Sequence, residues 1–243
     1  MIGRPSERFS ERAAAYAQNR PGYPPEALDA LLDGLGPPEK LTIADVGAGT
    51  GIASRLLAER GATVIAVEPN HSMAERAEPD PRIEWIDGTG ENTRLPDRSV
   101  DMAAAFQAFH WFEPQAAIAE FKRISRKRIA MVQYERDESD AFAAAYGDLV
   151  RRYATEPIEQ RRAEALTTFV RLAGSSCARS EHPYAQSLDR AEMLGRMAST
   201  SYLPRDGPPA DELRGEASAL FDRFAQDERV SLAMICYVQR SDA

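Results

Sequence analysis

Apolar residues form short β-branched runs that alternate with longer helical patterns in the first half of the chain. The short runs predict strands, and segments whose apolar side chains recur every three to four residues predict helices. The predicted strands cover residues 41–46, 63–67, 82–86, 100–106 and 128–134, and the helices between them cover 52–60, 72–77 and 114–124. Strands and helices that alternate at this spacing predict a parallel sheet with helices on both faces.

Helical patterns flank this alternating region. Residues 7–19 and 26–35 predict two helices, separated by a proline-rich segment that cannot continue a helix. Beyond residue 134 the pattern predicts helices over 140–172, 190–197 and 210–225, with strands at 182–188 and 230–239. We therefore expect one domain over residues 1–243, divided into amino-terminal lid helices (1–36), a core (37–136), a helical cap insertion (137–180) and the carboxyl-terminal part of the sheet (181–243).

Composition narrows the possible partners. The net charge of -8 argues against general affinity for nucleic acid, which needs a basic surface, and against docking on anionic membrane. The two cysteines, Cys177 and Cys236, lie far apart and predict neither a disulfide framework nor a metal site. No run approaches the ~18 apolar residues of a membrane span, and no secretion signal precedes the first helix, so we expect a cytoplasmic protein.

A glycine-rich turn follows the first predicted strand of the core. Asp45 precedes the turn, Gly47, Gly49 and Gly51 lie within it, and Glu68 ends the next strand. Glycine lets the backbone turn sharply and lets a ligand approach closely. An acid at the end of the following strand is placed to bind ribose hydroxyls. These residues predict a nucleotide-type pocket.

The spacing of the glycines helps to identify the nucleotide. The dinucleotide fingerprint G-x-G-x-x-G requires a third glycine where this chain has Ile52. The carboxylate of Asp45 would also repel a pyrophosphate, whereas it suits a ligand with an ammonium group, such as the amino acid end of S-adenosylmethionine. A nicotinamide-dependent oxidoreductase is therefore the less favoured alternative.

The glycine turn resembles motif I of the class I S-adenosylmethionine-dependent methyltransferases, and more closely their type 11 small-molecule branch. Three further segments are similar to motifs of trans-aconitate methyltransferase-like proteins: Tyr16-Ala-Gln-Asn-Arg-Pro-Gly-Tyr-Pro, Phe109-His-Trp-Phe and Ser199-Thr-Ser-Tyr-Leu-Pro. The resemblance runs over nearly the whole chain. It implies an α/β fold with a Rossmann-like, doubly wound, seven-stranded and mostly parallel sheet, whose last strand is antiparallel, plus the helical lid and cap.

The resemblance also implies an activity. S-adenosyl-L-methionine would be the cofactor and S-adenosyl-L-homocysteine the product, with the methyl group passed to a small-molecule acceptor through a carboxylate, hydroxyl or similar group. The protein would be a cytoplasmic monomer or homodimer without metal, nucleic-acid or membrane partners. An inactive module that only binds the cofactor remains an alternative.

Residues at the matching positions acquire roles from the resemblance. Three glycines would line the methionine part of the cofactor, Asp45 would approach its ammonium, and Glu68 would take both ribose hydroxyls. The implied cofactor-binding set is Tyr16, Arg20, Asp45, Gly47, Gly49, Gly51, Glu68, Met73, Thr89, Gly90, Glu91 and Gln107. Within it, Met73 and the Thr89-Gly-Glu triplet would contact adenine, and Gln107 would lie near the methyl region. Tyr23, Phe109 and Trp111 would line the acceptor pocket.

His110 is the candidate general base, because the resemblance places it at the carboxyl edge of the sheet; simple packing of its ring beside Trp111 is the alternative. Two departures from the family pattern matter. Thr89 stands where relatives usually carry an aspartate, so we expect weaker but retained adenine binding. The turn before the fifth strand reads Arg123-Ile-Ser-Arg-Lys-Arg and lacks the usual glycines.

Overall fold

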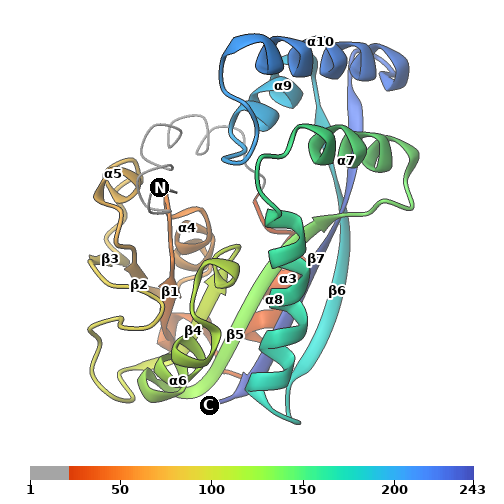
Figure 1. Ribbon diagram of the computed structural model, residues 1–243. Coiled ribbons are helices and arrows are strands. Elements are labelled where there is room, and N and C mark those ends of the chain that lie inside the picture. The colour runs from red at the N-terminus through yellow and green to blue at the C-terminus, as the bar shows by residue number, and fades with distance from the viewer. Residues whose placement is uncertain (1–21) are drawn as a thin grey trace.

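The computed structural model describes residues 22–243, which contain one seven-stranded sheet in the order β3-β2-β1-β4-β5-β7-β6 (Figure 1). The strands are β1 (Thr42–Val46), β2 (Thr63–Val67), β3 (Ile83–Ile86), β4 (Val100–Phe106), β5 (Ser125–Arg136), β6 (Ala178–Leu188) and β7 (Val230–Asp242). The first five are parallel, and β7 runs antiparallel to both β5 and β6. The predicted Rossmann-like sheet with an antiparallel last strand is confirmed.

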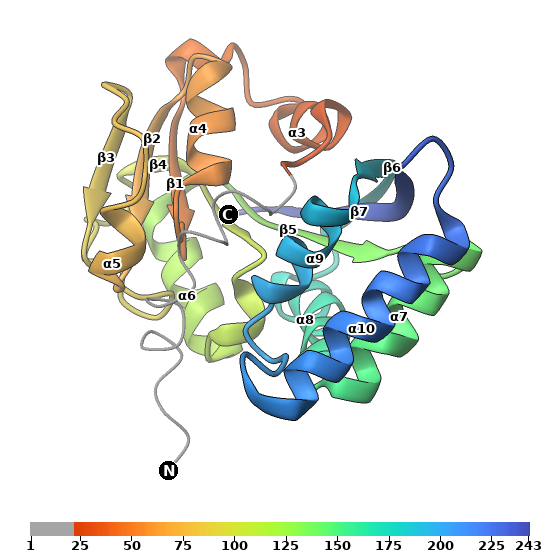
Figure 2. The same cartoon turned by 90° about the horizontal axis from the view of Figure 1, so that it is seen from above.

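Helices cover both faces of this sheet. They are α3 (Pro25–Leu32), α4 (Ile52–Glu59), α5 (His71–Ala74), α6 (Pro114–Ile124), α7 (Ala141–Tyr153), α8 (Ile158–Ala173), α9 (Arg190–Ala198) and α10 (Gly207–Phe224), with 3-10 turns at Pro38–Lys40 and Phe109–Trp111. Helices α3, α4, α7, α9 and α10 contribute to one buried apolar cluster (Figure 2). Helices α6 and α8 contribute to a second cluster, on the opposite face of the sheet.

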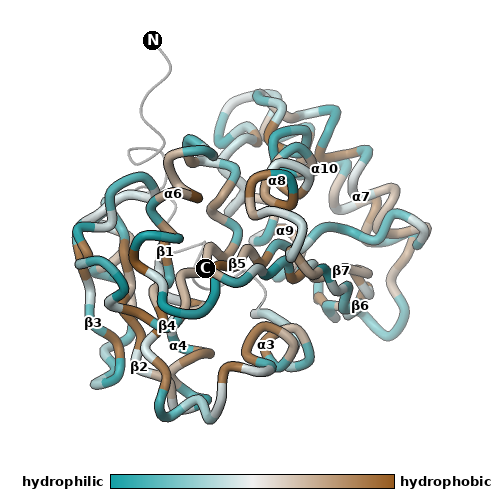
Figure 3. The backbone as a smooth tube through the Cα atoms, turned by 90° about the horizontal axis from the view of Figure 1, so that it is seen from below, coloured by the Kyte–Doolittle hydropathy of each residue, from teal (hydrophilic) through white to brown (hydrophobic). Residues whose placement is uncertain are grey.

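The alternation of side chains along the strands separates these two clusters. On β1, Ile43 belongs to the cluster under α3 and α4, whereas Ala44 and Val46 belong to the cluster under α6. Because successive side chains of a strand point to opposite faces, a strand covered on both sides must be apolar at nearly every position. Hydrophobic segments accordingly lie along the strands and in helices such as α3 and α8, and the loops are mostly hydrophilic (Figure 3).

The junction between α6 and β5 explains the missing glycines. Helix α6 ends at Ile124 and β5 begins at Ser125, three residues earlier than the apolar pattern predicts. The basic side chains that obscured the strand are held by partners: Arg126 and Lys127 pair with Asp101, and Arg128 donates to the carbonyls of Leu31 and Asp33. A direct helix-to-strand connection needs no glycine turn.

Helices α9 and α10 lie in the connection between β6 and β7, and α10 runs beside α7 (Figures 1 and 2). Helix α7 packs on β7 and α9 on β6, and α10 packs on both of these helices. None of the helices within residues 22–243 is long and apolar enough to cross a membrane. Nor do these residues hold any group of three or more histidine, cysteine or acidic side chains arranged to bind a metal ion.

Candidate functional site

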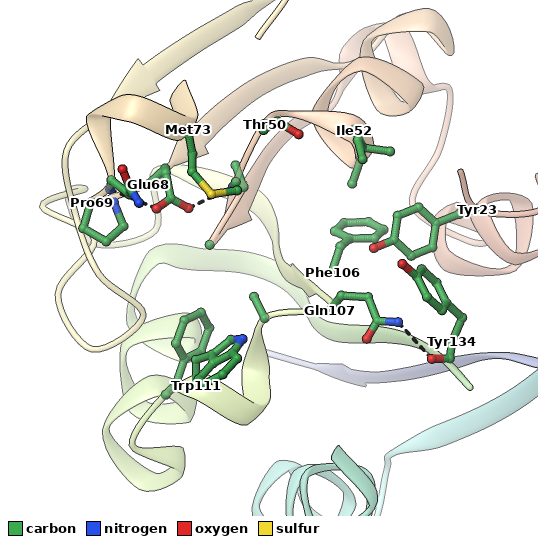
Figure 4. Close-up of a pocket in the computed structure, with 17 residues that line it drawn as sticks. Tyr23, Thr50, Ile52, Glu68, Pro69, Met73, Phe106, Gln107, Trp111 and Tyr134 are labelled. Atoms are coloured by element: carbon green, nitrogen blue, oxygen red, sulfur yellow. Dashed lines mark hydrogen bonds between the residues drawn. The ribbon is translucent and has the colours of Figure 1, made fainter. Parts of the chain in front are cut away.

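A pocket lies at the carboxyl ends of β1, β2 and β4, where ligands bind in open α/β sheets (Figure 4). Its walls come from the glycine turn, the ends of three further strands and the start of α3. The lining residues are Tyr23, Gly47, Ala48, Gly49, Thr50, Ile52, Ala53, Glu68, Pro69, Asn70, Met73, Phe106, Gln107, Ala108, Trp111, Phe112 and Tyr134. Seven of the predicted site residues lie here: Tyr23, Gly47, Gly49, Glu68, Met73, Gln107 and Trp111.

 

Phe112, the last residue of the Phe109-His-Trp-Phe motif, also lines the pocket, although no individual role was predicted for it from the sequence. Tyr16 and Arg20 lie outside the described residues. Apart from Phe112, the lining residues without a predicted role follow strand ends or the glycine turn, and two of them, Phe106 and Tyr134, are aromatic. Their position at the carboxyl ends of β4 and β5 is the signal that would have found them.

The glycine turn is tied to the neighbouring strand. The N–H groups of Gly47 and Ala48 both donate to the carbonyl of Val67, at 2.8 and 3.1 Å. Gly47 has a φ of 75°, and a Cβ atom there would lie 2.6 Å from the Cβ of Ala108. A side chain at this position therefore meets both backbone strain and a steric clash. Glycine is needed for the loop to pass this close to the end of β4.

Glu68 connects the end of β2 to the same turn. Its Oε2 accepts a hydrogen bond from the Gly49 N–H at 2.8 Å, and its Oε1 accepts one from the Asn70 N–H at 2.9 Å (Figure 4). Burial raises the pKa of Glu68, and these two backbone donors oppose that shift. Each carboxylate oxygen has more than one acceptor position. The carboxylate is thus fixed in orientation and still able to accept two ribose hydroxyls.

Asp45 lies behind the pocket rather than in its lining. Its side chain is completely buried; Oδ2 accepts from the Ser54 hydroxyl at 2.6 Å, and Oδ1 has no hydrogen-bond partner among residues 22–243. Burial raises the pKa of Asp45 to about 7, the Ser54 hydrogen bond opposes this rise, and the charge of Glu68 adds to it. A buried oxygen without a donor fits a nearby cationic ligand group, so the predicted approach to the cofactor ammonium stays a prediction.

The raised pKa of Asp45 predicts how stability changes with pH. Between its ordinary pKa of 3.8 and about 7, the folded protein holds a proton that the unfolded chain has lost, so the contribution of Asp45 to stability falls as pH rises through this range. Urea denaturation of Asp45→Asn should therefore show a smaller loss of stability from pH 5 to pH 8 than the parent protein. The exposed Asp206→Asn variant is the control and should follow the parent. Equal pH dependence in the parent and Asp45→Asn would contradict this prediction.

Gly51 does not line the pocket, although the resemblance implied that it would line the methionine part of the cofactor. Its φ is 78°, and a Cβ atom there would lie 3.0 Å from Cζ2 of Trp85 on β3. The third glycine of the turn therefore makes room for a tryptophan of the sheet edge. No local pattern in the sequence links these two residues.

Replacing Gly51 by alanine should destabilise the fold by about 1–3 kcal/mol, because a left-handed backbone and a close contact with Trp85 combine. Tryptophan fluorescence during urea unfolding measures this change directly. Gly215→Ala is the matched control: a Cβ there meets open space within α10, so the same substitution should be neutral or stabilise by up to about 1 kcal/mol. Equal stability of the two variants would exclude the role assigned to Trp85.

Only one of the residues predicted to contact adenine lines the pocket. Met73 lines the pocket, with its Cε 3.1 Å from where a Cβ on Gly49 would lie. Thr89 and Glu91 do not: the Oγ1 of Thr89 accepts from the Asn92 N–H, and Oε1 of Glu91 accepts from the Glu113 N–H at 2.7 Å.

Gly90 also lies outside the lining, and it acts on the pocket through Phe112. A Cβ on Gly90 would lie 2.5 Å from Cγ of the Phe112 ring. The absence of a side chain at Gly90 therefore lets this ring reach the pocket wall. The predicted adenine contacts of residues 89–91 remain predictions.

The Phe109-His-Trp-Phe motif distributes its side chains between the core and the pocket. Phe109, predicted in the acceptor pocket, is 1% exposed and packs edge-on against Phe169 of α8, with ring centroids 5.3 Å apart. It belongs to the core, because the 3-10 turn directs it toward α8. Trp111 lines the pocket, while its contact with the acceptor stays a prediction, and the His110 ring lies 4.8 Å from the Trp111 ring without lining the pocket itself. This contact matches the packing alternative for His110, and its role as a base remains a prediction.

Aromatic side chains enclose the end of the pocket farthest from Glu68 (Figure 4). Tyr23 packs edge-on against Phe106 with centroids 5.1 Å apart, and its ring lies 5.7 Å from that of Tyr134. Gln107 comes directly after Phe106 in the chain, and its Nε2 donates to the Tyr134 carbonyl at 2.9 Å. The pocket thus has a polar end built on Glu68 and an aromatic end built on Tyr23, Phe106 and Tyr134.

Comparison with known proteins supports the reading of this pocket. The family model described as a methyltransferase domain matches residues 44–130, which contain the glycine turn and Glu68. Residues 44–130 are thus similar to a methyltransferase domain. The predicted resemblance to the type 11 methyltransferases is thereby confirmed, while the trans-aconitate branch stays a prediction.

Relatives extend the similarity beyond this domain. An uncharacterized methyltransferase of Mycobacterium tuberculosis is 36% identical over 156 residues, covering 63% of this chain and 62% of that protein. The chain thus spans about three fifths of the length of this curated relative. A candidate type II methyltransferase from Anaeromyxobacter dehalogenans shares the fold with 26% identity and a TM-score of 0.63, over 92% of this chain and 97% of the other.

A second solved structure contains the product of the predicted cofactor. Phosphoethanolamine N-methyltransferase 2 of Haemonchus contortus was solved with S-adenosylhomocysteine and phosphomonomethylethanolamine. It is 16% identical to this chain with a TM-score of 0.50, covering 96% of this chain and 58% of that protein. At this identity the likeness concerns the fold alone.

Proposed function

We propose that this protein transfers a methyl group from S-adenosylmethionine to a small-molecule acceptor. The observation that carries the proposal is Glu68: its carboxylate is fixed by the Gly49 and Asn70 N–H groups on the wall of the pocket at the carboxyl edge of the sheet. This is the arrangement that a ribose diol requires. A nicotinamide dinucleotide is less suitable, because Ile52 stands where the dinucleotide fingerprint needs its third glycine.

The residues of the pocket fit the parts of the cofactor. Glu68 would hold the ribose, Met73 would pack on adenine, and the turn at Gly47 and Gly49 would follow the methionine part. The cofactor supplies the electrophilic methyl group on a sulfonium. The protein's own contribution is to align the acceptor and exclude water. Aromatic rings beside a sulfonium can add about 0.5–2 kcal/mol of cation–π attraction, and Tyr23 and Trp111, which line the pocket, are our candidates for this contact.

The proposal also covers the class of acceptor, the oligomeric state and the parts of the domain. A net charge of -8 favours a small acceptor over a nucleic acid, and we expect a cytoplasmic monomer or homodimer. We also assign residues 1–36 to a lid, 37–136 to the cofactor-binding core, 137–180 to a cap over the acceptor and 181–243 to the rest of the sheet. Helices α9 and α10, which lie within this last part and pack beside α7, extend the cap.

Ligand titration tests the cofactor, and a transfer assay tests the activity. Calorimetry should detect saturable binding of S-adenosylhomocysteine and none of NADH. A screen of organic acids and phenols with labelled S-adenosylmethionine should then yield a methylated product. Binding of NADH but not of S-adenosylhomocysteine would support the oxidoreductase instead. Binding without transfer to any acceptor would support an inactive cofactor-binding module.

A further inference from the structure

Gln107 is held in an unusual conformation where β4 ends. Its φ is 53°, in the left-handed region that side chains other than glycine rarely adopt. Two contacts to β5 hold it there: its backbone N–H donates to the Val132 carbonyl and its Nε2 donates to the Tyr134 carbonyl, both at 2.9 Å. A strained residue that is fixed by several contacts on a pocket wall suggests a functional role.

These contacts determine which way the Gln107 amide faces. The Tyr134 carbonyl can only accept hydrogen bonds, so it must meet the NH2 group of the amide. Arg162 also donates to this carbonyl. The other end of the amide, Oε1, can only accept, and no donor within residues 22–243 reaches it. Gln107 therefore brings a buried hydrogen-bond acceptor, fixed in orientation, to the wall of the pocket.

The pocket lining around Gln107 is aromatic and uncharged, because the nearby Arg162 lies outside the lining and is paired with Glu135. Tyr23, Phe106 and Tyr134 lie on one side of it, and Trp111 lies on the other (Figure 4). Among the described lining residues Glu68 is the only charged one, and it lies at the opposite end of the pocket. Aromatic walls favour a flat ring, whereas a carboxylate placed here would lose its hydration without gaining a cationic partner from the described lining.

We propose that Gln107 selects an uncharged aromatic acceptor that donates an O–H or N–H hydrogen bond to its Oε1. This rests on the proposed function, and it narrows the acceptor from any small molecule to phenol-like, alcohol-like or amine-like aromatics. Oε1 of Gln107 is covered by neighbouring side chains. The amide of Gln107 would keep its orientation, and a covering side chain of the pocket wall would rotate to let the acceptor reach Oε1.

Four naphthalenes of similar shape test this selection on protein saturated with S-adenosylhomocysteine. 1-Naphthol and 1-naphthylamine carry a donor, 1-methoxynaphthalene lacks one, and 1-naphthoate is an anion. Calorimetry should show 1-naphthol binding about 10-fold more tightly than 1-methoxynaphthalene, the effect of one hydrogen bond. 1-Naphthylamine should share this advantage, and 1-naphthoate should bind more weakly than 1-naphthol.

Variants attribute the preference to the amide. Gln107→Leu should reduce the advantage of 1-naphthol over 1-methoxynaphthalene to within about 2-fold, since no acceptor remains. Gln107→Gly, which suits the positive φ, provides the same comparison if Gln107→Leu fails to fold. The exposed Gln115→Leu on α6 is the matched control and should keep the preference.

Several results would overturn the proposal. They are equal or tighter binding of 1-methoxynaphthalene or 1-naphthoate, no binding of any of the four compounds, or a preference that survives in both Gln107 variants. A larger loss of S-adenosylhomocysteine affinity than of 1-naphthol affinity in these variants would place Gln107 against the cofactor instead. The parent protein's affinity for S-adenosylhomocysteine is measured first, so failure of the cofactor proposal is detected separately.

Discussion

Replacing Glu68 by alanine should weaken the binding of S-adenosylhomocysteine by about 100-fold or more. A carboxylate that accepts two ribose hydroxyls makes two charge-assisted hydrogen bonds, each contributing about 1.5–3 kcal/mol. Loss of both corresponds to a change of at least two orders of magnitude in Kd. The substitution also removes the acceptor of the Gly49 N–H, so the glycine turn loses its connection to β2. Calorimetry on the folded variant measures the effect.

Two further variants make the test specific. Glu84→Ala removes an exposed carboxylate from β3, the neighbouring strand, and should bind the ligand like the parent. Glu68→Gln keeps the shape and one good acceptor oxygen, so its affinity should fall between those of the parent and Glu68→Ala. A folded Glu68→Ala protein with unchanged affinity, alone or combined with Gly49→Val, would refute the assignment of this pocket to the cofactor.

Replacing Phe109 by alanine should lower the free energy of unfolding by about 3–5 kcal/mol, the usual range for removing a buried phenylalanine. The ring is 1% exposed and packs between Phe112 and Phe169, whose centroids lie 6.2 and 5.3 Å away. Its removal would leave a cavity where the turn after β4 meets α8. Urea denaturation followed by circular dichroism measures the loss.

The size of this effect distinguishes a core residue from a pocket residue. Val170→Ala, at the most exposed large apolar side chain described on α8, should change stability by less than about 0.5 kcal/mol. Phe109→Leu retains most of the buried surface and should destabilise less than Phe109→Ala. If Phe109→Ala were as stable as the parent but lost acceptor binding, the ring would belong to the pocket as the resemblance implied.

The contrast between Phe109 and Trp111 shows how far the sequence motif can be read. Both belong to one four-residue motif at the end of β4, yet Trp111 lines the pocket and Phe109 lies in the core. The direction of each side chain depends on the 3-10 turn at Phe109–Trp111 and on the position of α8. A motif therefore predicts that these residues are near the site without predicting which of them face it.

The polar end of the site could be predicted from the sequence, because the glycine turn and the acid after β2 are each recognised within a short stretch of chain. Alternating strand and helix patterns place β1 and β2 side by side, the positive φ angles at Gly47 and Gly49 need glycine, and the acid that ends β2 must then face the turn. The parallel sheet and the nucleotide-type pocket could be predicted for this reason, whereas the antiparallel last strand was implied by the family resemblance.

Other features depend on residues that meet only in the folded protein. Gly51 faces Trp85 rather than the ligand, Tyr134 closes the aromatic end, and a carbonyl of β5 orients the Gln107 amide. Each involves a partner from another strand, and the strand register and the cap helices bring the partners together. The sequence by itself determined the fold and the nucleotide-type pocket, because backbone periodicity and glycine conformation are local properties. Only the tertiary structure decided which side chains face the acceptor, because that depends on packing between segments distant in the chain.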